Sequence, residues 1–169
     1  MELSIREFWA VIHGFFLGGL FLLAFAGGLA GLYSLRPALI TPEGIRERTR
    51  RLTIGITTMA VVAWATVVSG TWIVYPWYRE DVPDSPRSLL LANPDTEDWH
   101  IFGMEWKEHV AWIAPLLATV AAFIVLYYRT DLIRNRAARL IAIWTFVAAF
   151  LIAGIAGVFG ALITKNESV

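Results

Sequence analysis

Four long stretches without Asp, Glu, Lys or Arg dominate the sequence and limit the folds open to it. They cover residues 8–33, 52–75, 110–128 and 140–164. Each is near or above the ~20 residues that an α-helix needs to cross the hydrocarbon core of a bilayer. The stretches are continuously apolar, whereas strands of a transmembrane barrel alternate apolar and polar residues over about ten positions. The sequence therefore predicts an all-α integral membrane protein with four transmembrane helices in one domain.

The overall composition agrees with this class and excludes several others. Apolar residues make up 57% of the chain and charged residues 17%, against roughly 45–50% and 25% in soluble domains. Basic and acidic residues balance at 14 each, so the chain lacks the basic surplus of a nucleic-acid-binding protein. Because there is no cysteine, disulfides, thiolate-ligated iron–sulfur clusters and covalently attached c-type haem are excluded. Any metal would have to be bound by histidines and carboxylates.

The charged residues lie mainly in the connections between the apolar stretches. Residues 34–51 contain five arginines against two glutamates, and residues 129–139 contain four arginines against one aspartate. The connection 76–109 has the opposite balance, with three basic and eight acidic residues. Short loops rich in Lys and Arg are retained in the cytoplasm. We therefore expect loops 34–51 and 129–139 to be cytoplasmic and both termini to be outside, in an up-and-down bundle of a prokaryotic plasma membrane.

Aromatic residues in the connection 76–109 recur at helical spacing. The run Asn93-Pro94-Asp95 is typical of a helix start, since Asn caps helices and Pro suits their first position. Trp99, Phe102 and Trp106 follow on one helical face beside acidic residues. This pattern predicts a short interfacial helix that lies on the bilayer and continues into the third span after Gly103.

Small residues recur four apart within the apolar stretches. Gly14 with Gly18 and Gly27 with Gly31 form two such pairs, and this spacing lets membrane helices approach closely. The pairs are explained either by helix packing or by space for a flat cofactor between helices. Pro115 lies near the start of the third span and predicts a kink there, because proline leaves the carbonyl four residues earlier without its donor.

Two histidines are the main candidates for cofactor binding. His13 is the only ionisable residue within the four stretches, and His109 lies at the mouth of the third. The first and third spans run in the same direction, so the two rings are expected at similar depth, where they could face one central space. We therefore predict one b-type haem ligated by His13 and His109, with room provided by Gly14 and Gly18 and with Trp112 covering the porphyrin. This arrangement resembles that of membrane b-type cytochromes.

A carboxylate close to His109 suggests a second kind of site. Glu105 and His109 are four residues apart and share one helical face. Together with His13 they form a set of two histidines and one carboxylate, which suits a single Zn²⁺, Cu²⁺ or non-haem iron ion. In the haem hypothesis Glu105 instead accepts a hydrogen bond from the imidazole and so tunes the ligand.

These observations favour a membrane electron-transfer subunit over an autonomous enzyme. We expect it to bind its haem near the outer face, to belong to a larger respiratory or photosynthetic complex, and to contact the lipid bilayer and other membrane subunits. The acidic outer loop is a candidate docking surface for a basic electron carrier. The alternatives are a cofactor-free structural or assembly subunit, whose glycine faces pack against partner helices, and a subunit with the single-metal site.

Overall fold

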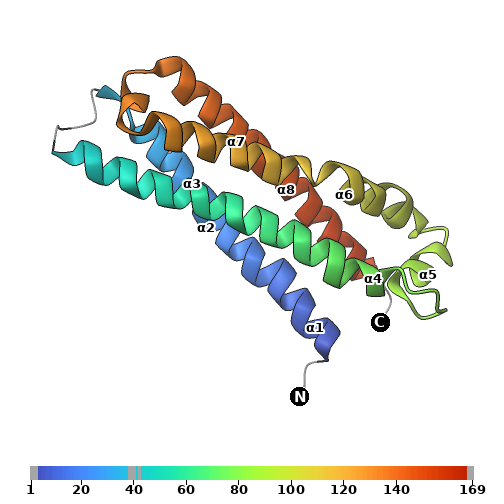
Figure 1. Cartoon of the computed structure of the whole chain (residues 1–169). Helices are drawn as coiled ribbons and strands as arrows, with labels where there is room; N and C mark the ends of the chain where they lie inside the picture. Colours follow the sequence, from blue (N-terminus) through green and yellow to red (C-terminus); the bar gives the residue numbers. More distant parts are fainter. Residues whose placement is uncertain (1–3, 38–40, 42, 167–169) are drawn as a thin grey trace.

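Four long helices make up most of the chain. The computed structural model describes residues 4–37, 41 and 43–166, and within these residues every regular element is a helix. The helices that are long and apolar enough to cross a membrane are Ile5–Ser34, Gly44–Tyr78, Trp99–Ile133 and Arg136–Asn166. We call them the first to fourth long helices. They run alternately in opposite directions (Figure 1), which confirms the predicted all-α fold with four long apolar helices.

Three of the long helices change their winding along their length. The first consists of α1 (Ile5–Ala10), the π-helix η1 (Val11–Phe16) and α2 (Leu17–Ser34). The second consists of α3 (Gly44–Ser69), the π-helix η3 (Gly70–Val74) and α4 (Tyr75–Tyr78). The third consists of the π-helix η4 (Trp99–Met104), α6 (Glu105–Val110), α7 (Ile113–Tyr128) and the 3-10 helix η5 (Arg129–Ile133). The fourth is α8 (Arg136–Asn166), and the short helix α5 (Pro86–Leu91) lies between the second and the third.

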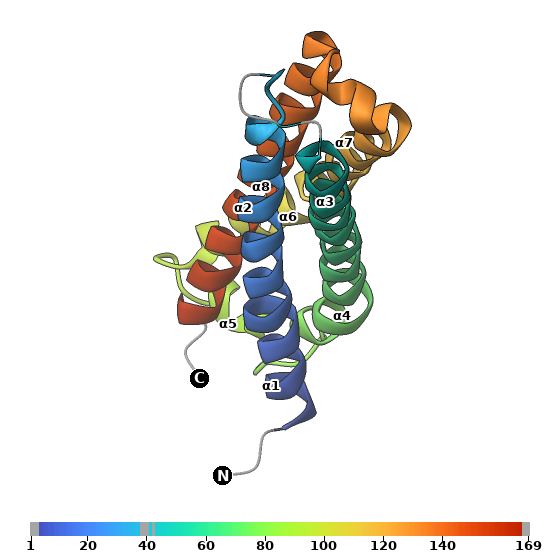
Figure 2. The same ribbon diagram turned by 90° about the vertical axis from the view of Figure 1, so that its left-hand side faces the viewer.

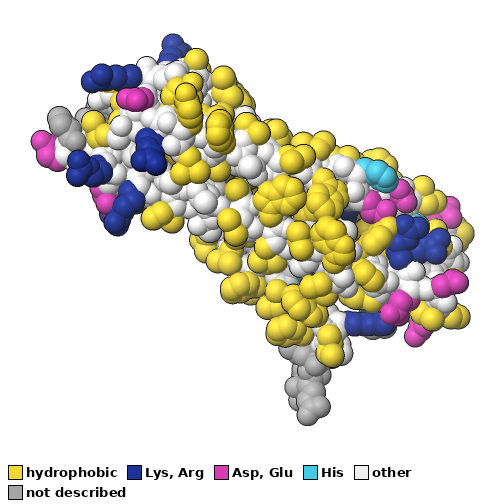
Figure 3. Space-filling view, in the orientation of Figure 1, with side chains coloured by type: hydrophobic (Ala, Val, Ile, Leu, Met, Phe, Trp, Pro, Cys, Tyr) yellow, Lys and Arg dark blue, Asp and Glu magenta, His cyan; other side chains and the backbone are white. Residues whose placement is uncertain are grey.

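The two ends of the bundle differ in charge. The connections around residues 35–43 and 129–135 lie at one end, which we call the arginine end (Figure 1). The connection 79–98 lies at the other, which we call the acidic end, together with the first and last described residues. Figure 3 shows basic side chains at the arginine end, most acidic ones at the acidic end, and a broad apolar surface between them. An apolar belt of this kind is suited to contact with lipid.

The main core fills the half of the bundle nearer the arginine end. Leu32, Ile56 and Phe146 are fully buried there. Alanines of α7 and α8, including Ala118 and Ala142, are also fully buried, and their small size lets these two helices pack closely.

Glycines bring the first two long helices together. A Cβ at Gly28 would lie 3.1 Å from the side chain of Ile56, and one at Gly31 would lie 3.0 Å from the side chain of Leu52. By contrast, nothing lies within 4 Å of a Cβ placed at Gly27. Helix packing therefore uses Gly28 with Gly31, rather than the pair of Gly27 and Gly31 that the spacing indicates.

The third long helix begins well before the uncharged stretch 110–128. The Asn93 side chain accepts a hydrogen bond from the Asp95 amide at 2.9 Å, and this turn leads into helix at residue 97. The helix then continues to Ile133 with one interruption, a turn at Ala111 and Trp112. The predicted interfacial helix is thus the first part of the third long helix, and its position on a bilayer stays a prediction. The interruption lies within one turn of Pro115, as a proline without an amide donor requires.

The first and fourth long helices touch near their middle and diverge toward the acidic end. The Phe25 ring stacks on Phe150 and Phe146, with centroid distances of 3.8 and 5.2 Å, and Phe21 stacks on Phe150 at 5.8 Å. Figure 2 shows α1 and the last turns of α8 separating beyond this contact. In the diverging parts, a Cβ at Gly14, Gly18, Gly154 or Gly157 would meet nothing within 4 Å.

Candidate functional site

His13 projects from the π-helix η1 toward the second long helix. Its Nδ1 lies 3.0 Å from the Ser69 hydroxyl, and that hydroxyl donates to the Thr66 carbonyl at 3.1 Å. Because the single Ser69 proton is used on the carbonyl, His13 Nδ1 must carry the proton that joins it to Ser69. The other ring nitrogen, Nε2, is then an acceptor or a ligand in the neutral imidazole.

A glycine on the second long helix makes the position of His13 possible. A Cβ at Gly70 would lie 2.9 Å from His13 Cε1, which is closer than side chains pack. Gly70 begins the π-helix η3, and His13 lies in the π-helix η1. Single π-turns occur often at functional sites, so the paired irregular turns mark this contact as a specialised part of the bundle.

Lys107 extends from α6 into the same region. Its Nζ would lie 3.0 Å from a Cβ at Gly160 of α8, so here too a glycine provides the space for an ionisable side chain. Lys107 lies within electrostatic range of the His13 imidazole. His13 and Lys107 each lie eight residues inside a long helix that starts at the acidic end, which corresponds to a rise of about 12 Å from the start of each helix.

The role of Lys107 was missed by the sequence analysis, which assigned it to the outer connection. Four ionisable residues fall within the five positions 105–109, namely Glu105, Lys107, Glu108 and His109. This density of charge suggests a segment exposed to solvent. Continuation of the helix back to Trp99 instead places the residues on different faces. A helical signal was present, because Lys107 is two residues, or about 200°, away from His109.

His109 lies on the outer surface of α6. Its side chain is 72% exposed, and Nδ1 lies 2.8 Å from its own helix's Glu105 carbonyl. Glu105 Oε2 lies 3.8 Å from the same nitrogen. Since Lys107 faces Gly160 in the bundle, the 200° step turns His109 away from the space that His13 and Lys107 share.

The structure therefore does not bring the predicted haem ligands together. His13 faces Ser69 and Gly70, whereas His109 faces outward from α6. Trp112 is also engaged elsewhere, in edge contacts with Trp64 and Trp72 at centroid distances of 6.2 and 6.1 Å. Ligation of one haem by His13 and His109 therefore stays a prediction, as does haem binding itself.

The predicted single-metal site is only partly assembled. Glu105 and His109 are neighbours on α6, but His13 is held separately by the second long helix. In residues 4–37, 41 and 43–166 no group of three or more histidine, aspartate or glutamate side chains is placed to hold a metal ion.

A second polar network closes the acidic end of the bundle. The buried Tyr78 hydroxyl lies 3.0 Å from Nδ1 of His100. Arg79 donates to the Tyr75 hydroxyl and lies 3.7 Å from Glu108 Oε2. These contacts join the start of the third long helix to the end of the second. They therefore chiefly stabilise the bundle around the His13 and Lys107 region.

Comparison with known proteins adds no relative. Neither protein-family models, curated proteins nor solved structures give a match to this chain.

Proposed function

We propose that this chain is a membrane electron-transfer subunit that binds the head of a quinone or quinol between His13 and Lys107. The observation that carries the proposal is the placement of two ionisable side chains, from different long helices, in one region of an otherwise apolar bundle. Each is accommodated by a glycine on another helix, Gly70 on the second long helix or Gly160 on the fourth. Ionisable side chains at membrane depth are costly and mark ligand sites or proton pathways by default.

The hydrogen-bonding capacity of the two side chains matches a quinol head. Neutral His13 with its proton on Nδ1 offers Nε2 as acceptor for a quinol hydroxyl. The Lys107 ammonium has three donors and suits a carbonyl or hydroxyl oxygen. A quinone and its quinol carry two such oxygens on opposite sides of one ring, and one molecule can therefore engage both side chains.

We expect a lipid-soluble molecule to enter where the first and fourth long helices diverge (Figure 2). Their facing stripes change from stacked phenylalanines, Phe21 and Phe25 against Phe150, to uncovered glycines toward the acidic end. The glycines Gly18 and Gly157 have no neighbour within 4 Å of an added Cβ. An isoprenoid-tailed molecule can reach the site from the bilayer at this level.

Binding of a short-chain quinone to the purified protein in nanodiscs tests the proposal. We expect Lys107→Met and His13→Phe each to weaken binding of decylubiquinone, oxidised or reduced, by about 10-fold or more. A hydrogen bond to a charged group contributes about 1.5–3 kcal/mol, which is roughly 10- to 150-fold in affinity. Lys165→Met removes an exposed lysine at the same end of the bundle and should leave binding unchanged.

Two outcomes would contradict quinone binding. One is a parent protein that takes up no more quinone than empty nanodiscs. The other is equal binding by the parent and both site variants, which would mean that quinone merely partitions into the lipid. Either outcome would favour the alternative of a cofactor-free assembly subunit.

A haem held at the surface of α6 is a second candidate, supported by the fixed ring of His109. The Glu105 carbonyl can only accept, so His109 Nδ1 carries the proton, and Nε2 faces away from the bundle. Metal-bound histidines usually donate their other ring nitrogen to a carbonyl or carboxylate in this way. Here a second ligand would come from another subunit.

The oxidised and reduced absorption spectra of the protein, purified with its natural partners, test this second candidate. We expect the spectrum of a b-type haem. His109→Ala should abolish this spectrum, and Glu105→Gln should leave its shape unchanged. His13→Ala should leave the spectrum unchanged, because His13 faces a different region. Absence of haem from the wild-type complex would refute the candidate.

A further inference from the structure

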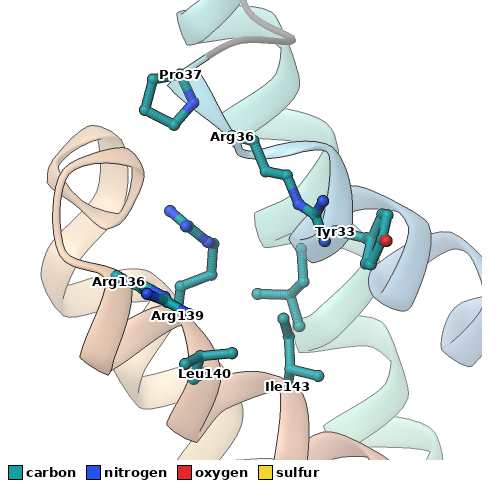
Figure 4. Close-up of a pocket in the computed structure, with 8 residues that line it drawn as sticks. Tyr33, Arg36, Pro37, Arg136, Arg139, Leu140 and Ile143 are labelled. Atoms are coloured by element: carbon teal, nitrogen blue, oxygen red, sulfur yellow. The ribbon is translucent and has the colours of Figure 1, made fainter.

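A pocket of about 390 Å³ at the arginine end is lined by three guanidinium groups. Arg36 follows the end of α2, and Arg136 and Arg139 lie in the first turn of α8. Figure 4 shows these side chains around one space, with Tyr33, Leu140 and Ile143 beside them. The pocket is therefore cationic on one side and apolar on the other.

The contacts that these guanidinium groups make leave their positive charge in place. Arg36 stacks over the Tyr33 ring at 3.8 Å from its centroid. Arg139 donates through Nη1 to the carbonyls of Leu132 and Ile133, at 3.1 and 2.9 Å, and these bonds orient the group without cancelling its charge. Within the described part of the chain none of the three arginines forms an ion pair, and the Arg136 side chain makes no hydrogen bond.

Among the described residues that line the pocket none is acidic, so no carboxylate of the lining competes with a bound anion for the arginines. Three guanidiniums around one space match the oxygens of a phosphate, which arginine binds in paired hydrogen bonds. The apolar wall is formed by side chains of the first and fourth long helices themselves, Leu32, Leu140 and Ile143. Acyl chains attached to the phosphate would continue along Leu140 and Ile143.

We propose that this pocket is a binding site for an anionic phospholipid, with the phosphate held by Arg36, Arg136 and Arg139. Basic pockets between transmembrane helices on the cytoplasmic side bind such headgroups, and the sequence places the arginine-rich connections on that side. A free phosphate ion would use the guanidiniums but not the apolar wall. The lipid uses both, so it is the occupant that the lining favours. The site is independent of the His13 and Lys107 region at the other end.

The experiment compares short-chain lipids on the delipidated full-length protein in detergent. Dioctanoyl phosphatidylglycerol should bind at least 10-fold more tightly than dioctanoyl phosphatidylcholine, measured by native mass spectrometry or calorimetry. The variant with both Arg36→Gln and Arg136→Gln should lose this preference, and Arg136→Gln alone should weaken it several-fold. Arg139 is left in place because it also holds the carbonyls of Leu132 and Ile133.

Arg48→Gln is the matched control, because Arg48 is exposed at the same end but does not line the pocket. It should change the affinity for phosphatidylglycerol by less than about twofold. An equal loss in Arg48→Gln would mean that diffuse surface charge attracts the lipid, and it would overturn the proposal. Binding of inorganic phosphate as tightly as phosphatidylglycerol would identify a free anion site instead. Equal binding of the two lipids would also overturn the proposal.

Discussion

At the scale of single residues, glycines decide where ionisable side chains can lie in this bundle. Gly70 and Gly160 face His13 and Lys107, and at each a methyl group would come within about 3 Å of the opposite side chain. Gly157 is on the same helix as Gly160 but faces open space. The role of a glycine in this fold therefore depends on the residue that lies opposite it, and its spacing in the sequence alone does not reveal that role.

We predict that Gly70→Ala destabilises the protein and that Gly157→Ala does not. The new methyl at position 70 must displace the His13 ring, and such overpacking costs about 1–3 kcal/mol. At position 157 the better helix propensity of alanine is worth up to about 1 kcal/mol, so that variant should be neutral or slightly more stable. Thermal unfolding in detergent, followed by circular dichroism, gives the comparison. Equal melting temperatures for the two variants would show that Gly70 is not in close contact with His13.

At the scale of elements, π-helical turns separate the compact part of the bundle from the part that carries the site. The segments η1, η3 and η4 all lie in the half nearer the acidic end. For η3 a cause is visible in the sequence, because Pro76 follows it closely and has no amide to continue the regular ladder. Beyond the stacked phenylalanines the first and fourth long helices separate, so these rings are the main contact that holds the two helices together.

We predict that Phe25→Ala weakens this contact more than an equal truncation on the lipid-facing surface. Phe25 stacks on both Phe146 and Phe150, and each aromatic pair contributes about 0.5–1.5 kcal/mol beyond its buried area. Phe123 is the control, because it is 64% exposed on α7 and stacks only on its helix neighbour Tyr127. The loss in Phe25→Ala should be about 1–3 kcal/mol, or several degrees in melting temperature. A larger loss in Phe123→Ala would contradict the assigned helix contact.

At the scale of the whole molecule, charge is sorted between the two ends of the bundle. The arginine-rich connections share one end, and the acidic connection lies at the other with both ends of the described chain (Figures 1 and 3). From the positive-inside rule we expect the His13 and Lys107 region to lie near the outer face. The lipid pocket would lie near the inner face.

We predict that single cysteines at the two ends are labelled from opposite sides of the membrane. The chain has no cysteine of its own, so Asp84→Cys and Arg134→Cys each introduce a unique thiol at an exposed position. A membrane-impermeant maleimide should label Asp84→Cys in intact cells and Arg134→Cys only after lysis. Arg134 is preferred to Asn135, because the Asn135 side chain caps α8 through the Ala138 amide at 3.0 Å. Labelling of Arg134→Cys in intact cells would reverse the orientation.

The sequence by itself determined the class, the number of long helices and the end to which each connection belongs. These properties follow from summed hydropathy and from loop charge, which do not depend on how helices rotate against each other. The interruption near Pro115 was predictable for a similar reason, since a missing amide acts within one turn. The helix ends were less predictable. The charged residues from Glu105 to His109 suggest a loop, although they lie in a helix that begins at Trp99.

Only the tertiary structure decided which side chains meet. Equal depth suggested that His13 and His109 face each other, but depth along a helix does not fix the direction around it. The packing of Lys107 against Gly160 fixes the rotation of α6 about its axis. His109 is about 200° away from Lys107 around the helix and therefore points outward. The pocket of Arg36 and Arg139 depends in the same way on two helices that are distant in sequence. Rotation and crossing of helices arise from close packing between them, and this information is absent from any one segment.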